Sequence, residues 1–213
     1  MSHTLHRSGS EESLSKDFVI LIMPENGLND QNSEQRLRAC FDILLKHNPV
    51  NTGDSKNGSR YSLGSDEEVI KRLEEKETIF AVYDNENDLV GVLKDLKALD
   101  CGLSVVISGL FEHSCKCAEK VGLHPHTAGI SLGVMGKTEL LPEDNVKDIS
   151  VMCGHGLISY ALIEKLVEEV RKGKKTSQQA AAEMAKCCIC GVFNVKRAEA
   201  IISSMVKVVS SNL

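Results

Sequence analysis

Short apolar runs alternate with helical segments between residues 78 and 121. Residues 78–83 and 103–108 are apolar and strand-sized, so they predict strands. Residues 87–99, whose apolar side chains recur every three or four positions, and 110–121 predict helices. Strands that alternate with helices are typical of layered proteins in which helices cover a sheet. We therefore expect an α/β (or α+β) fold with a layered, mostly parallel sheet and flanking helices.

Other segments extend this pattern in both directions. Residues 18–23 predict a buried strand, and 33–46 and 66–76 predict helices from the spacing of their apolar side chains. Two later segments, 127–135 and 146–152, predict further strands, the first weakened by glycines.

The chain of 213 residues fits one domain with a helical appendage. Residues 1–16 are polar and predict a flexible N-terminal tail. Residues 17–155 predict the α/β core, interrupted by a long polar loop at 47–64. Residues 156–213 read as a C-terminal section of three consecutive helices, packed on the core.

Composition excludes some classes of function. The net charge is −5, aromatic residues make up 4% of the chain and there is no Trp, whereas a protein that binds nucleic acid needs cations and stacking surfaces. No apolar run approaches the roughly 20 residues of a membrane span, and the N-terminus has no signal core. We therefore expect a cytoplasmic protein that binds neither nucleic acid nor membrane; composition leaves its oligomeric state open.

Cysteine is the most informative residue type. The chain has eight cysteines, seven of them from Cys101 onward. In a cytosolic protein such a number indicates metal ligands, redox thiols or catalytic thiols rather than structural disulfides. Cys40 and Cys101 stand among apolar residues, and we expect both to be buried as small hydrophobic side chains.

A run of three cysteines, Cys187, Cys188 and Cys190, contains a C-x-x-C between its first and last members. Two thiolates at that spacing can bind one ion or form a reversible disulfide. Thiolate-rich sites suit zinc or an iron–sulfur cluster. Because there is no second C-x-x-C, further ligands must come from distant segments.

The sequence Cys-Gly-His-Gly at 153–156 follows a predicted strand and precedes a predicted helix. A thiol near a helix N-terminus has a lowered pKa, so Cys153 is a candidate nucleophile. His155 is its candidate base, or a metal ligand.

Our leading functional hypothesis is a thiolate-rich protein that binds an iron–sulfur cluster or zinc and acts in redox chemistry or metalloenzyme assembly, with a redox or metalloenzyme partner protein. Its candidate ligands are Cys117, Cys153, Cys187, Cys188 and Cys190. One alternative is a metal-free enzyme with Cys153 and His155 as its nucleophile and acid–base pair. A further alternative is a partner-binding protein without catalytic activity.

Overall fold

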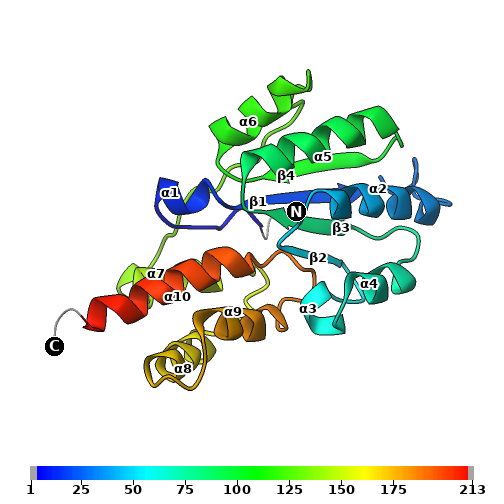
Figure 1. Ribbon diagram of the computed structural model, residues 1–213. Helices are drawn as coiled ribbons and strands as arrows, with labels where there is room; N and C mark the ends of the chain where they lie inside the picture. The colour runs from blue at the N-terminus through cyan, green and yellow to red at the C-terminus, as the bar shows by residue number, and fades with distance from the viewer. Residues whose placement is uncertain (1–3, 211–213) are drawn as a thin grey trace.

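Four strands form one sheet with the order β2-β3-β1-β4, in a computed structural model that describes residues 4–210 (Figure 1). Every neighbouring pair in this sheet is antiparallel. The strands are β1 (Phe18–Met23), β2 (Asn51–Asp54), β3 (Ile79–Tyr83) and β4 (Ser104–Ser108).

The expectation of a mostly parallel sheet is therefore wrong. Because β1 pairs antiparallel with both β3 and β4, these two strands run in the same direction, as a helical crossover requires. However, β1 lies between them, so they are never neighbours. The alternation of strand and helix predicts the shared direction of β3 and β4 and leaves open which strands pair.

Helices cover both faces of the sheet, so β1, β3 and β4 contribute apolar side chains to a core on either side (Figure 1). One face carries α2 (Glu34–Lys46), α5 (Glu86–Leu99) and α6 (Phe111–Lys120), with α4 (Asp66–Arg72) near β2. The other face carries α7 (Asp144–Ser150), α8 (Tyr160–Arg171), α9 (Ser177–Ala185) and α10 (Val195–Ser210). Two short helices are α1 (Glu11–Leu14) and α3 (Arg60–Leu63), and a 3-10 turn spans Thr138–Leu140. Within residues 4–210, no helix is long and apolar enough to cross a membrane.

The central strand β1 divides its side chains between two cores. Phe18, Ile20 and Ile22 pack with α2 and α5, whereas Val19 and Leu21 pack with the C-terminal helices. Successive side chains of a strand point to opposite faces, so a strand buried on both faces reads as a continuous apolar run. That run looks the same in a parallel and an antiparallel sheet.

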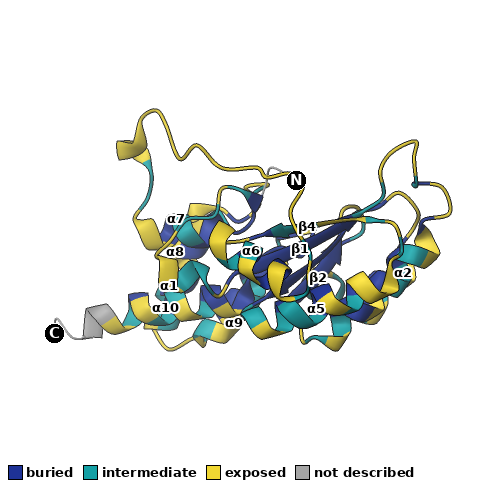
Figure 2. Cartoon of the chain, turned by 90° about the horizontal axis from the view of Figure 1, so that it is seen from above, coloured by how far each residue is buried: buried dark blue, intermediate teal, exposed yellow. Residues whose placement is uncertain are grey.

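Two strand predictions in the second half are wrong. Residues 127–135 form no regular structure and are exposed, as Figure 2 shows for the chain that leads to α7. Residues 146–152 begin in helix α7, and their fully buried large apolar side chains are Val146, Ile149 and Met152. Those positions are three residues apart, a helical spacing, whereas a half-buried strand alternates every two.

The predicted polar loop at 47–64 contains β2 and α3. Strand β2 is buried although its sequence is Asn-Thr-Gly-Asp. Its polar side chains find partners inside the protein; for example, Nδ2 of Asn51 donates to the carbonyl of Phe193 at 3.0 Å. Apolar periodicity misses such a strand, because its burial depends on hydrogen bonds rather than apolar side chains.

Residues 4–16, for which the sequence predicts a flexible tail, pack against the core in the structure. The side chain of Arg7 is 5% exposed and forms an ion pair with the buried carboxylate of Asp17. The same guanidinium donates to the carbonyl oxygens of Met152 and Val192. The N-terminal segment is thereby attached to two turns that carry cysteines.

Candidate functional site

Four side chains from two distant turns meet on the face of the sheet that carries the C-terminal helices. Cys153 and His155 lie in the turn between α7 and α8, and Cys188 and Cys190 lie in the turn between α9 and α10. Sγ of Cys190 is 4.0 Å from Sγ of Cys188 and 3.8 Å from Nδ1 of His155. The thiol of Cys188 also interacts with that of Cys153. These contacts form a chain, in the order 153–188–190–155, which we call the thiol cluster.

The turn that carries Cys188 and Cys190 is held against strand β2 by close backbone contact. Gly191 has φ of +76°, and a Cβ there would collide with the carbonyl of Thr52. A Cβ at Gly53 would lie 2.7 Å from the carbonyl oxygen of Cys190. Glycine at both positions therefore lets the two backbones approach, which fixes Cys190 beside the sheet.

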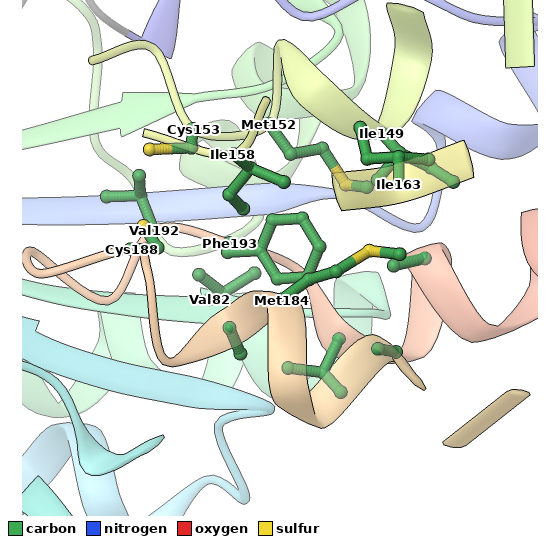
Figure 3. Close-up of a cluster of buried hydrophobic side chains, with 14 of the residues drawn as sticks. Val82, Ile149, Met152, Cys153, Ile158, Ile163, Met184, Cys188, Val192 and Phe193 are labelled. Atoms are coloured by element: carbon green, nitrogen blue, oxygen red, sulfur yellow. The ribbon is translucent and has the colours of Figure 1, made fainter. Parts of the chain in front are cut away.

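The turn that carries Cys153 is anchored by buried apolar side chains, Met152 and Ile158 among them. Oγ of Ser150 donates to the carbonyl of Ile158 at 2.7 Å and closes the turn. Figure 3 shows Cys153 and Cys188 near Val192 in this apolar cluster. The sequence places Cys153 directly before a helix, but the next helix begins only at Tyr160, so the dipole of α8 does not act on this thiol.

Burial differs sharply along the thiol cluster. Cys153, Cys188 and Cys190 are 1%, 0% and 3% exposed, whereas His155 is exposed. A cavity of about 250 Å³ lies at the end of the cluster that contains His155 and Cys190. The other lining residues come from β1, from the start of β3 and from the end of β2: Leu21, Met23, Ser55, Thr78 and Phe80. The thiol of Cys190 therefore borders a cavity, while the other two thiols lie in the apolar core.

The pKa values of the three thiols also differ, and Cys190 again stands apart from the other two. The interaction with Cys188, together with burial, raises the pKa of Cys153 far above its usual value. For Cys188, the hydrogen bond with Cys153 lowers the pKa, but the contact with Cys190 and burial outweigh it and raise the pKa to about 12. The hydrogen bond with Cys188, helped by the backbone N–H of Val192, holds the pKa of Cys190 below its usual value despite burial. Of the three, Cys190 is the thiol most readily deprotonated.

The remaining candidate ligands lie elsewhere. Cys117 is buried in α6 within the core on the opposite face of the sheet, so it does not join the thiol cluster. Cys187 is half-buried and packs at the margin of the core beneath the C-terminal helices. Among residues 4–210, no group of three or more His, Cys, Asp or Glu side chains is arranged to hold a metal ion. The metal hypothesis accordingly stays a prediction.

Sequence reasoning singled out Cys153 and His155 as one pair and missed the contact between His155 and Cys190. One signal was present: Cys153/His155 and Cys188/Cys190 are both spaced i, i+2. Two turns with matching spacing can bring four reactive side chains together. The sequence carried no signal that Arg7 would bond the turn at Met152 or that the polar strand β2 would bond the turn at Phe193. Both contacts join residues that are far apart along the chain.

Comparisons of the chain with models of known protein families, with curated proteins and with solved structures give no match.

Proposed function

We propose that this protein is a thiol–disulfide oxidoreductase in which Cys190 attacks a disulfide and Cys188 resolves the mixed disulfide. One observation carries the proposal: Sγ of Cys190 borders a cavity and has both an imidazole nitrogen and a second thiol within 4.0 Å. A nucleophilic thiol, a base and a resolving thiol are the groups that this exchange needs.

The exchange proceeds in two steps. His155 takes the proton of Cys190, and the thiolate attacks one sulfur of the substrate disulfide. The disulfide bond breaks, a mixed disulfide forms at Cys190, and the first substrate thiolate leaves and is protonated. Cys188 then loses its proton and attacks Sγ of Cys190, and the second substrate thiolate leaves. Two electrons pass to the substrate, the protein keeps a Cys188–Cys190 disulfide, and a dithiol reductant restores the two thiols.

The cavity favours Cys190 over Cys153 as the attacking thiol. Thiolates rather than thiols are nucleophiles, so the thiol with the lower pKa reacts at neutral pH. The pKa of Cys190 is lowered, that of Cys153 is raised, and Cys153 is not among the residues that line the cavity. Cys153 contacts Cys188 within the apolar core and takes no part in the exchange.

Oxidised glutathione tests the proposal directly. In a Cys188→Ser variant the mixed disulfide cannot be resolved, so we expect one glutathione to accumulate on Cys190, within the tryptic peptide 187–196. In a Cys190→Ser variant we expect no adduct on this peptide. All proteins carry Cys187→Ser, so that the peptide holds only the two cysteines of interest. Equal adduct formation in the Cys190→Ser and Cys188→Ser variants would overturn the proposal.

A zinc site is a second candidate, because two pairwise distances among these side chains are close to those of a tetrahedral site, although no three donors among residues 4–210 are already arranged around an ion. In a tetrahedral site two sulfurs lie about 3.8 Å apart, and a sulfur and a nitrogen about 3.5 Å apart. The corresponding distances here are 4.0 Å and 3.8 Å. Metal analysis of anaerobically purified protein is the test. Zinc in the parent that is lost in a Cys188→Ser/Cys190→Ser variant would support this candidate, and a metal-free parent would overturn it.

A further inference from the structure

A second pair of thiols lies on the opposite face of the sheet from the thiol cluster. Sγ of Cys40 is 3.1 Å from Sγ of Cys101, although the two residues are 61 positions apart in the sequence. Cys40 is in helix α2, and Cys101 is in the turn between α5 and β4. This pair contributes nothing to the function proposed above.

The distance is short for two thiols that merely pack as apolar side chains, whose sulfurs would stay about 3.5–4.0 Å apart at van der Waals contact. A disulfide needs about 2.05 Å between its sulfurs. The step from 3.1 Å to that length is about 1 Å, which small rotations of two side chains can supply without a rearrangement of the backbone.

The turn that carries Cys101 is held in place beside α2. Asp100 ends α5 in the left-handed conformation, with φ of +44°, and Gly102 follows with φ of +69°. Nδ2 of Asn29 donates to the carbonyl of Gly102 at 2.6 Å, and Arg36 of α2 donates to the carbonyl of Asn29 at 2.5 Å. These bonds tie the turn to the helix that contains Cys40, so the two sulfurs are brought together by the folded chain.

The two thiols differ in access. Cys101 is half-buried, whereas Cys40 is 0% exposed. Burial and the neighbouring Cys101 thiol raise the pKa of Cys40 well above its usual value. A reagent from solvent therefore meets Cys101 first, and Cys40 is placed to attack the product.

We propose that Cys40 and Cys101 are an oxidisable pair that forms a disulfide across α2 and the α5–β4 turn when the protein meets a small disulfide. In the first step the thiolate of Cys101 attacks the reagent, forms a mixed disulfide and releases one thiolate. In the second, Cys40 loses its proton and attacks Sγ of Cys101, and the second thiolate of the reagent leaves. Two electrons pass to the reagent, and a thiol reductant reverses the reaction.

Peptide mapping after treatment with oxidised glutathione tests the pair. Trypsin releases Cys40 in peptide 39–46 and Cys101 in peptide 98–116, which also contains Cys115. We therefore use a Cys115→Ser parent, in which a link between these peptides can only join Cys40 to Cys101. We expect the linked peptide in the parent and none in a Cys101→Ser variant of it.

Thermal unfolding provides a second readout that does not depend on mapping. A link that closes a long loop restricts the unfolded chain, so we expect oxidation to raise the Tm of the parent and a reductant to restore it. The Cys101→Ser variant, altered at a half-buried position, should keep its fold and show no such rise. Free, alkylatable Cys40 and Cys101 in the oxidised parent would overturn the proposal, whatever happens to peptide 187–196.

Discussion

Nη1 of Arg197 donates to Oδ2 of Asp17 at 2.9 Å, and both side chains are buried, at 2% and 0% exposure. Arg197 belongs to α10, and Asp17 directly precedes β1. The other carboxylate oxygen of Asp17 pairs with Arg7, which also bonds the carbonyls of Met152 and Val192. One carboxylate therefore joins the N-terminal segment to α10 and, through Arg7, to both turns of the thiol cluster.

The Asp17→Ala variant should be severely destabilised. Loss of the Asp17 carboxylate leaves the buried guanidinium groups of Arg7 and Arg197 without their partner, which costs about 3–5 kcal/mol of unfolding free energy. Urea unfolding followed by circular dichroism measures this, since the chain has no Trp for fluorescence. The matched control is Asp144→Ala, which removes an exposed ion pair with Lys147 and should change the free energy of unfolding far less than Asp17→Ala does. Equal losses in the two variants would contradict the structural role of Asp17.

Alkylation should distinguish Cys190 from Cys153 by its dependence on pH. The contact with Cys188 holds the pKa of Cys190 below its usual value, so its thiolate fraction, and with it the alkylation rate, should rise at a lower pH than for an ordinary thiol. The pKa of Cys153 is raised, so this thiol should remain slow through the same range. Iodoacetamide and mass spectrometry of peptides 187–196 and 148–165, in a Cys187→Ser parent, give both rates. Faster alkylation of Cys153 would reverse our assignment of the attacking thiol.

Substitution of Gly191 by Ala should disturb the thiol cluster more than the same change at another glycine. Gly173 has a similar positive φ of +68°, and a Cβ there would point into open space, so Gly173→Ala should cost about 1–2 kcal/mol for the backbone alone. Gly191→Ala adds a collision with the carbonyl of Thr52, so we expect a larger loss and slower alkylation of Cys190. Urea unfolding compares the stabilities. Equal effects would show that the close approach to β2 matters little.

Limited proteolysis should cut the long segment before α7 first. Residues 124–140 are exposed, and among them Leu132 and Met135 are 79% and 74% exposed. Lys137 is the one trypsin site between residues 121 and 146. Exposed chain without regular structure is the preferred substrate of proteases. We expect fragments 1–137 and 138–213 on a gel before any other products; an earlier cut at Lys97, within helix α5, would contradict this.

Much of the local structure could be predicted from apolar periodicity. The strand at 18–23, the strands at 78–83 and 103–108 and the helix at 33–46 all appear, with ends shifted by a residue or less. The periodicity succeeds there because each segment buries a regular set of side chains. It fails at 127–135, where apolar side chains alternate yet are exposed, since a strand also needs a neighbouring strand to pair with.

By itself the sequence determined the segments that bury a regular apolar pattern, namely the strands at 18–23, 78–83 and 103–108 and the helix at 33–46. It also indicated which turns carry reactive side chains such as Cys153 and Cys190. Only the tertiary structure decided that β1 separates β3 from β4, that His155 meets Cys190, and that Cys40 meets Cys101. The physical reason is the separation along the chain of the residues involved. Periodicity records how each residue relates to the next few along the chain, whereas strand order and sulfur contacts arise when distant segments bury their surfaces together.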